Sequence, residues 1–294
     1  MLSIRLTISS VLSFMLGQAN AAEFWDKPIP SNSPEKSAAT YHDVPIDFND
    51  SRYREALLPL RKYGVDGEAF YSVKDGSNFP YNECICEGKR SLSSRKSVAE
   101  KLRAVNHELA RHNLELHVFD AYRSVECQTA LWKHFMKQAK KALGEDASND
   151  ALVKYASNYC SNPTFFKKDD WHSWPTHSTG GAVDLTLKRK GSAELLYMGG
   201  VFDDDSIVSK TNFYELSEIS DSNVPQANAA VITVPRSSIS AEEAQRNRRI
   251  LYWTMLKHGF SNYHNEWWHF DYGNQMWVQS SREQSKPKAF YGTI

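Results

Sequence analysis

The 294-residue sequence has no excess of either charge, because Lys and Arg together number 35 and Asp and Glu also number 35. A balanced chain has no broad electrostatic attraction for nucleic acid, so we expect no nucleic-acid partner. Repeats and low-complexity linkers are also absent, which makes a single domain the simplest organisation. Hydrophobic residues at 41% and charged residues at 24% are typical of a globular protein.

Long hydrophobic runs are missing too, apart from a short one near the N-terminus. Residues 6–17 are largely apolar, follow Arg5, and precede Ala19-Asn20-Ala21, which has the small-x-small form of a signal cleavage site. The run is too short to span a bilayer as a helix. We therefore predict a signal peptide over residues 1–22 and an exported, periplasmic or extracellular protein. After cleavage we expect no membrane contact, and the oligomeric state stays open.

The rest of the chain divides by composition. Residues 23–50, with several prolines, are predicted to be an irregular leader, and residues 51–294 to be the folded domain. Within that domain, residues 203–239 are polar and contain Asp203-Asp-Asp, serine-rich turns and Pro225. A polar segment of this length between predicted elements indicates a lid or rim over a pocket.

Cysteine is scarce, with four residues in the chain. In an exported protein an even number favours disulfides. Cys84 and Cys86 are too close in sequence to pair comfortably with each other, so each is expected to bond to one of Cys127 and Cys160, in an order that the sequence leaves open. The alternative is a second, thiolate metal site, for which one Cys-x-Cys is a weak signal.

Hydrophobic periodicity predicts helices and strands in irregular alternation. The expected helices cover residues 93–113, 124–144 and 240–259, and the expected strands cover residues 114–120, 181–188 and 267–272. In the second strand, alternation places Asp184 on the face opposite Val183 and Leu185. This irregular order favours an α+β fold over a doubly wound α/β fold.

Two segments carry the residue types of a hydrolytic metal centre. A catalytic zinc takes three protein ligands, keeps a position for water, and needs a free carboxylate nearby to accept a proton. His177 in a glycine-flanked turn and Asp184 on the strand that follows supply two ligands. His269 supplies a third if the last strand pairs beside that strand. Glu266 would face away from His269 in a regular strand, so this scheme requires Glu266 to lie in a preceding turn.

A plainer interpretation of the same residues is also available. A histidine and an aspartate seven positions apart are common by chance, and a Trp-Trp-His string is common in hydrophobic cores. Spacing alone therefore leaves core packing as an alternative to a metal site.

The ordered motifs resemble those of the VanX-type D-alanyl-D-alanine dipeptidases, within the wider group of zinc D,D-peptidases. The resemblance spans roughly residues 65–275. It is carried, in order, by Asp120-Ala-Tyr122-Arg123, His177-x-x-Gly180-x-Ala182-x-Asp184, Met198-Gly199 with Phe202-Asp203, the run Glu243 to Arg249 ahead of Gly259-Phe260, and Glu266-Trp-Trp-His269.

The resemblance implies an α+β fold with a small, mostly antiparallel central sheet flanked by helices. It also implies zinc-dependent hydrolysis of the D-alanyl-D-alanine dipeptide in cell-wall metabolism, so that the partner is a small D-amino-acid dipeptide. By the same resemblance, one zinc ion is held by His177, Asp184 and His269. Glu266 is then the general base, which activates the water and passes its proton to the leaving amine.

Three further roles follow from the resemblance. Arg123 would stabilise the developing oxyanion, a role that suits a fixed guanidinium with paired donors. Asp203 would bind the free ammonium of the dipeptide, with help from Tyr71. The plainer alternatives are a surface salt bridge for Arg123 and a solvated acidic turn for Asp203, beside Asp204 and Asp205.

Two other functions share this chemistry or this fold. A D,D-carboxypeptidase or endopeptidase acting on peptidoglycan stem peptides would use the same catalytic residues, but it would not need Asp203 for a free ammonium. A non-catalytic zinc-binding or peptidoglycan-binding module would have no need of Glu266 or Arg123.

Overall fold

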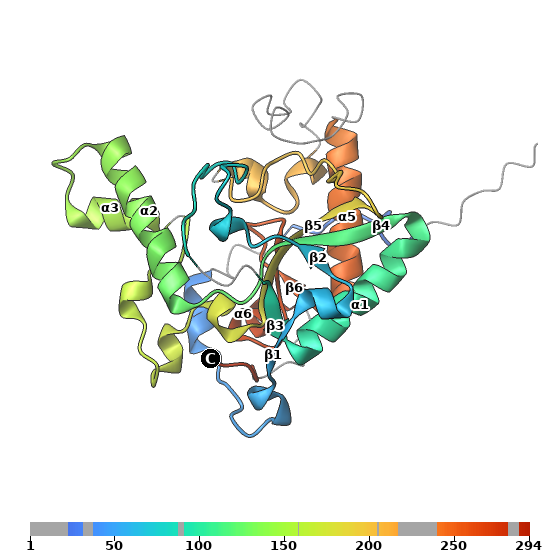
Figure 1. Cartoon of the computed structure of the whole chain (residues 1–294), viewed down its shortest axis with the longest axis horizontal. Helices are drawn as coiled ribbons and strands as arrows, with labels where there is room; N and C mark the ends of the chain where they lie inside the picture. The colour runs from blue at the N-terminus through green and yellow to red at the C-terminus, as the bar shows by residue number, and fades with distance from the viewer. Residues whose placement is uncertain are drawn as a thin grey trace, which may run out of the picture.

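The computed structural model describes residues 23–31, 38–87, 91–157, 159–204, 206–216, 240–281 and 288–294 (Figure 1). Helices and strands are mixed along this part of the chain, which confirms the α+β class. The predicted signal peptide at residues 1–22 and most of the predicted lid at 203–239 lie outside it. Within the described ranges, no helix has the length and apolar character that crossing a membrane requires.

A five-stranded sheet forms the centre of the molecule, in the order β2-β4-β5-β7-β6. Neighbouring strands from β4 to β6 run antiparallel, and β2 runs parallel to β4. A separate pair, β1 and β3, is antiparallel. The bounds are β1 (Leu57–Pro59), β2 (Asp66–Gly67), β3 (Ser93–Arg95), β4 (Leu114–Asp120), β5 (Ala182–Arg189), β6 (Ser261–Asn262) and β7 (His269–Asp271).

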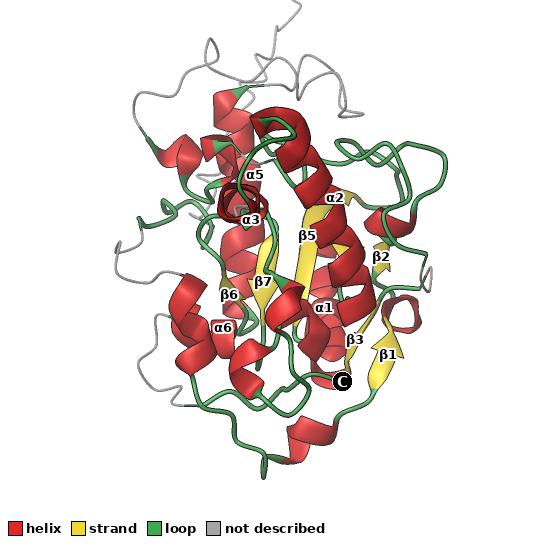
Figure 2. Ribbon diagram, turned by 90° about the vertical axis from the view of Figure 1, so that its left-hand side faces the viewer, coloured by secondary structure: helices red, strands yellow, loops and turns green. Residues whose placement is uncertain are grey.

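The longer helices cover both faces of this sheet. In Figures 1 and 2, α1 and α5 lie on one side of the sheet, and α2 and α3 lie on the other. Ser124 caps α2 by accepting from the Cys127 amide, and Ser240 caps α5 by accepting from the Glu243 amide. The helices are α1 (Lys96–Leu109), α2 (Val125–Leu143), α3 (Asn149–Ala156), α5 (Ala241–Lys257) and α6 (Gln275–Ser280).

Two of the expected elements differ from the structure. Residues 93–95 are strand rather than helix, because they pair with Leu57–Pro59, a partner that helical periodicity does not reveal. The last strand is shorter than expected and begins at His269, since Trp267 and Trp268 lie in the turn before it. By contrast, the strand predicted at 114–120 matches β4.

The N-terminal segment before residue 50 packs onto the domain. Its described parts contain the short 3₁₀ helix η1 (Ala38–Asp43) and bury Trp25 and Tyr41. The side-chain amide of Gln275, in α6, donates to the carbonyls of His42 at 3.0 Å and Val44 at 2.9 Å. These bonds hold η1 beside α6, next to the end of β7.

The cysteines form one disulfide rather than two. Cys86 bonds to Cys127 at the start of α2, whereas Cys84 and Cys160 are free thiols. The expectation of a second bond is therefore wrong. The Cys84 thiol donates instead to the carbonyl of Cys86, and Cys160 lines the cavity described below, where burial raises its pKa to about 12.

Candidate metal centre and catalytic cavity

Three predicted ligands meet at the junction of β5 and β7. His177 lies in the 3₁₀ turn η8 (Thr176–Thr179), which ends at Gly180 with a φ of 71°, a left-handed conformation that glycine adopts without strain. This turn leads directly into β5, where Asp184 lies opposite His269 in the register with β7. A cross-strand pair brings side chains on one face within contact, so the register itself joins the second and third residues.

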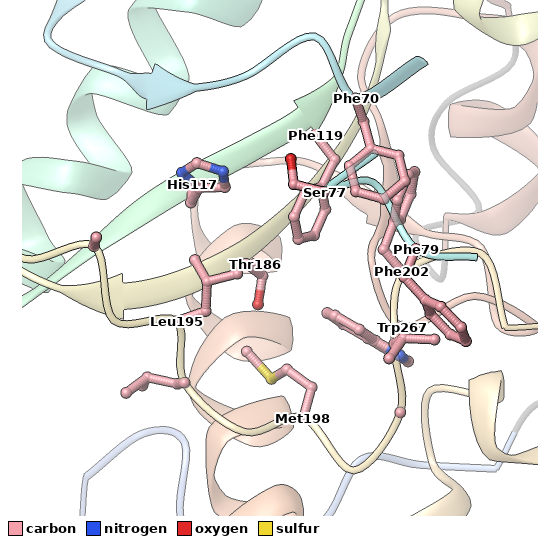
Figure 3. Close-up of a pocket in the computed structure, with 14 residues that line it drawn as sticks. Phe70, Ser77, Phe79, His117, Phe119, Thr186, Leu195, Met198, Phe202 and Trp267 are labelled. Carbon is pink, nitrogen blue, oxygen red and sulfur yellow. The ribbon is translucent and has the colours of Figure 1, made fainter. Parts of the chain in front are cut away.

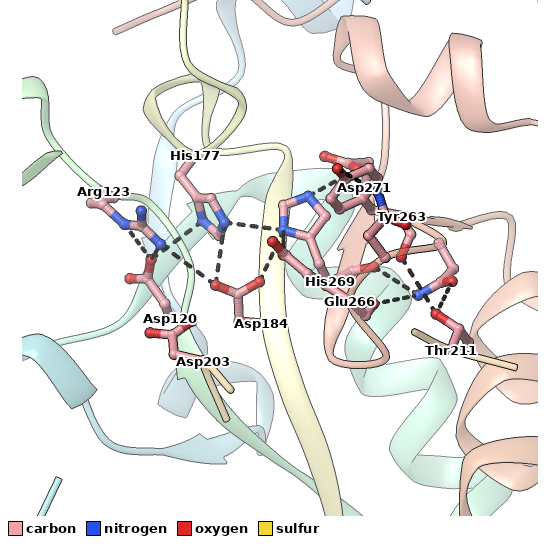
Figure 4. Close-up of polar contacts among 12 residues, drawn as sticks. Asp120, Arg123, His177, Asp184, Asp203, Thr211, Tyr263, Glu266, His269 and Asp271 are labelled. Carbon is pink, nitrogen blue, oxygen red and sulfur yellow. Dashed lines mark hydrogen bonds and ion pairs between the residues drawn. The ribbon is translucent and has the colours of Figure 1, made fainter. Parts of the chain in front are cut away.

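The potential ligand atoms of the three residues lie within 4.8 Å of one another, and all three residues are buried (Figure 4). The distance between His177 Nε2 and Asp184 Oδ2 is 3.3 Å, and that between His269 Nδ1 and Asp184 Oδ1 is 3.0 Å. His177 Nε2 and His269 Nδ1 are 3.3 Å apart. Two imidazoles and a carboxylate at this spacing make a donor set that fits a single zinc ion.

The other nitrogen of each imidazole is already engaged. His177 Nδ1 lies 2.8 Å from the carbonyl of Ala121, and His269 Nε2 lies 3.0 Å from Asp271 Oδ2. Because these oxygens accept hydrogen bonds, the facing nitrogens carry the protons and leave His177 Nε2 and His269 Nδ1 free to bind a metal. Asn274 in turn donates to Asp271 at 2.6 Å.

Negative charge dominates the cavity. Burial acts to raise the pKa of Asp184, but His177 and His269 outweigh it and hold this pKa well below its ordinary value. Burial likewise acts to lower the pKa of His269, but Asp271 and Asp184 raise it far above normal. Arg123 is the one Arg or Lys in the described lining of this cavity, and its guanidinium interacts with the carboxyl groups of Asp120, Asp184, Asp203 and Glu266. Such an excess of carboxylates favours a bound divalent cation.

Glu266 lies in the turn before β7, as the proposed scheme requires. Its amide donates to the carbonyl of Tyr263 at 3.0 Å, and its carbonyl accepts from the His269 amide at 3.2 Å. This turn brings Glu266 Oε2 to 3.7 Å from His269 Nδ1, beside the metal-binding atoms but outside the cluster of three. Burial and the charge of Asp184 raise the pKa of Glu266, which suits a general base.

Arg123 is 8% exposed, so a surface salt bridge does not describe it. Its Nε and Nη2 both lie 2.7 Å from Asp120 Oδ2, and its Nη1 donates to Gln128 at 2.9 Å. Nη2 also lies 3.5 Å from Asp184 Oδ2. These contacts fix the guanidinium at the edge of the metal centre (Figure 4).

Asp203 is held by two tyrosines rather than by solvent. Its Oδ2 accepts from Tyr71 at 2.7 Å and from Tyr81 at 2.9 Å. Burial and the nearby Asp184 raise the pKa of Asp203 to about 7. The solvated-turn interpretation is therefore wrong, and Tyr71 lies where the sequence placed it, beside Asp203.

Two residues that hold members of the site were not predicted from the sequence, Asp271 beside His269 and Tyr81 beside Asp203. Asp271 follows His269 by two positions in the same strand, so alternation could have placed both on one face. Tyr81 lies in a loop with no periodic pattern, and nothing in its spacing indicates its contact with Asp203.

The cavity at this centre is small, about 160 Å³, and Arg123, Asp203 and Glu266 are all in its wall. It adjoins an open cavity of about 490 Å³, with which it shares Tyr159, Asp203, Tyr263 and Glu266. Pockets for drug-sized molecules are roughly 300–1,000 Å³, so the inner cavity suits a smaller ligand.

A further cavity of about 290 Å³ lies along the same sheet face, lined by Phe119, Thr186, Phe202 and Trp267 among others (Figure 3). Its walls are mainly aromatic and aliphatic. The ring of His117 in this lining lies 3.6 Å from Asp66, away from the metal centre. Chemistry is therefore assigned to the metal centre and not to this cavity.

Comparison with known proteins agrees with this geometry. A family model described as D-ala-D-ala dipeptidase matches residues 57–287. A Synechocystis protein named D-alanyl-D-alanine dipeptidase is 27% identical over 245 residues, which are 80% of this chain and 92% of the relative.

Two other relatives carry the same name. The Enterococcus faecalis protein is 29% identical over 211 residues, which cover 71% of this chain and 86% of the relative. The Escherichia coli protein is 28% identical over 158 residues, which cover 54% of this chain and 55% of the relative.

Proposed function

Because this chain belongs to the D-ala-D-ala dipeptidase family, we propose that it hydrolyses the D-alanyl-D-alanine dipeptide in a zinc-dependent reaction. The observation that carries the proposal is the convergence of His177, Asp184 and His269, with Glu266 Oε2 3.7 Å from His269 Nδ1. This arrangement pairs a set of three ligands with a separate carboxylate, which a hydrolytic metal centre requires.

The metal would be held by His177 Nε2, Asp184 and His269 Nδ1. When bound, zinc supplies a Lewis acid that polarises the scissile carbonyl and acidifies water. Glu266 takes a proton from the attacking water and delivers it to the amine that leaves. Its raised pKa makes Glu266 a stronger base than an ordinary glutamate, which helps it take the proton from water.

Arg123 stabilises the charge that develops on the carbonyl oxygen. Because Asp120 and Gln128 already fix its guanidinium, little reorganisation is needed as that charge forms. Nη2 lies 3.5 Å from Oδ2 of the ligand Asp184, so the guanidinium borders the place where the reacting carbonyl would lie.

Asp203 selects the free ammonium of a dipeptide. A longer peptide with an amide at this position would leave a partly buried carboxylate without its cation, which costs binding free energy. The two tyrosine hydroxyls on Asp203 Oδ2 favour this function over that of a D,D-carboxypeptidase, because they fix a carboxylate that stem peptides do not need.

The remaining alternative is a zinc-binding or peptidoglycan-binding module without activity. Glu266 and Arg123 are both positioned at the metal centre, where such a module has no use for either. If the N-terminal signal directs export, the substrate is the dipeptide set free outside the cytoplasm, in cell-wall metabolism.

Metal analysis combined with a two-substrate assay tests this function. We expect about one zinc per chain, rapid hydrolysis of D-Ala-D-Ala, and little hydrolysis of an N-acylated tripeptide ending in D-Ala-D-Ala. Preference for the acylated tripeptide would show a D,D-carboxypeptidase, and metal without hydrolysis of either would show a binding module.

A further inference from the structure

The catalytic cavity contains a phenol that the proposed mechanism does not use. Tyr41, in η1, lines the cavity together with the metal-binding residues and is 4% exposed. It lies before residue 57, where the match to the family model begins. The segment predicted to be an irregular leader therefore supplies part of the wall of the site.

The hydroxyl of Tyr41 has no hydrogen-bond partner among the described residues. Ser161 is the neighbouring hydroxyl that acts on it, but without hydrogen-bond geometry between the two. A buried donor without a partner is costly, so this hydroxyl in the cavity wall calls for an acceptor that the described protein groups do not supply. Burial, more than any other cause, raises the pKa of Tyr41 far above its ordinary value, so the phenol stays a neutral donor.

The position of Tyr41 is fixed from two sides. Its ring lies against that of His42, with 3.9 Å between the centroids. The bonds from Gln275 to the carbonyls of His42 and Val44 anchor the same turn to α6. The phenol is thus held in place before any substrate arrives, which lowers the entropic cost of using it.

Tyr41 and Asp203 lie in different parts of the cavity wall, with different neighbours. Asp203 belongs to the β4 end, with Arg123 and Tyr71, whereas the titratable groups that act on Tyr41 are Asp271, in β7, and Tyr263, which follows β6 at the β7 end of the sheet. The sheet order places β5, with the ligand Asp184, between these ends. Figure 4 likewise shows Asp203 and Tyr263 on opposite sides of Asp184.

A dipeptide bound across the metal centre carries an ammonium at one end and a carboxylate at the other. With the ammonium at Asp203 and the peptide bond at the metal-binding residues, as the proposed function has it, the carboxylate of the leaving residue lies beyond the metal centre, away from Asp203. Asp271 at the β7 end is engaged by His269 and Asn274, so it is not an uncompensated charge facing the carboxylate. A phenol donating to a carboxylate makes a charge-assisted hydrogen bond, which is stronger than one between neutral groups.

We propose that the Tyr41 hydroxyl binds the C-terminal carboxylate of the dipeptide. Through this contact, the segment before residue 57 selects substrates that end in a free carboxylate at this position. This inference rests on the proposed function for the orientation of the substrate. Tyr41 is a specificity residue here and takes no part in proton transfer.

The test measures binding in zinc-loaded Glu266→Gln protein, in which turnover is blocked, with and without Tyr41→Phe. The two probes are D-Ala-D-Ala and its C-terminal amide. We expect Tyr41→Phe to weaken binding of the free acid by about 10- to 100-fold and binding of the amide far less.

Tyr53→Phe is the matched control, because Tyr53 packs against Phe48 outside the cavity. In the active enzyme, Tyr41→Phe should raise KM for the free acid and leave kcat nearly unchanged.

The outcomes distinguish a failure of the Tyr41–carboxylate contact from a failure of the proposed function. Unchanged binding of the free acid in Tyr41→Phe, or equal weakening of acid and amide, overturns the carboxylate contact. If Tyr41→Phe weakens only the acid but the wild-type enzyme hydrolyses no dipeptide, the contact stands and the proposed activity is wrong. If neither probe binds the zinc-loaded protein, both proposals are overturned.

Discussion

Asp184 and His269 lie directly opposite each other in the register of β5 and β7, 85 positions apart in the chain, with Asp184 Oδ1 3.0 Å from His269 Nδ1. Strand pairing, rather than a flexible loop, therefore sets the distance between two of the three metal-binding residues. A site built on paired strands holds its ligands in place before the metal binds.

Replacing Asp271 by Asn should weaken zinc binding without removing a ligand. Asp271 accepts from His269 Nε2 at 3.0 Å and so fixes which nitrogen faces the metal. Partners of this kind are typically worth about 10- to 100-fold in metal affinity. Competition with a chromogenic chelator measures the change, and Asp184→Asn, which alters a ligand itself, should lose more. An Asp271→Asn variant with wild-type affinity would contradict the assigned tautomer.

Glu266→Gln should keep the metal and lose turnover. The amide is nearly the same size as the carboxylate but accepts no proton, so kcat should fall by about 10²- to 10⁴-fold. Mass spectrometry of the native protein checks that zinc is retained, and a D-alanine release assay measures kcat. Hydrolysis at the wild-type rate would show that another group is the base.

The local elements were predictable because their signals are local. Alternation in β4 and the serine cap before α2 indicate those elements without knowledge of any partner. Residues 93–95 were assigned to a helix because their strand partner, 57–59, lies outside any local window. Pairing between distant segments overrides local propensity in such cases.

The candidate site was predictable only in part, for a similar reason. Motif resemblance identified His177 and Glu266, whose neighbours in sequence repeat the pattern of the family. Tyr41 lines the cavity and Tyr81 contacts Asp203 from irregular segments, where periodicity carries no information about direction. Their contacts depend on how loops pack on the sheet, which the spacing of residues does not encode.

Asp203 should give the affinity for the dipeptide a distinct pH dependence. Burial and the charge of Asp184 raise the pKa of Asp203 to about 7, so the carboxyl is protonated below that pH and cannot pair with an ammonium. KM should therefore fall as pH rises through this pKa, which a bound cation shifts downward. The profile of KM against pH measures the effect, and Asp203→Asn should raise KM and abolish the acid limb. An acid limb that persists in Asp203→Asn must come from another group.

The Cys86–Cys127 bond should stabilise the fold, because it ties the segment that follows Tyr81 to the start of α2 and closes the long stretch of chain between them. Its sequence separation of 41 residues corresponds to about 4 kcal/mol in the chain-entropy model, and measured effects are typically about 2–4 kcal/mol. The double variant Cys86→Ala, Cys127→Ala should therefore lower the free energy of unfolding in urea by about that amount. Cys84→Ala is the matched control, since it removes a half-buried thiol two residues before Cys86 without breaking a disulfide. Equal stability of the double variant and the control would mean that the loop is already ordered in the unfolded ensemble or that the bond does not form in the native protein.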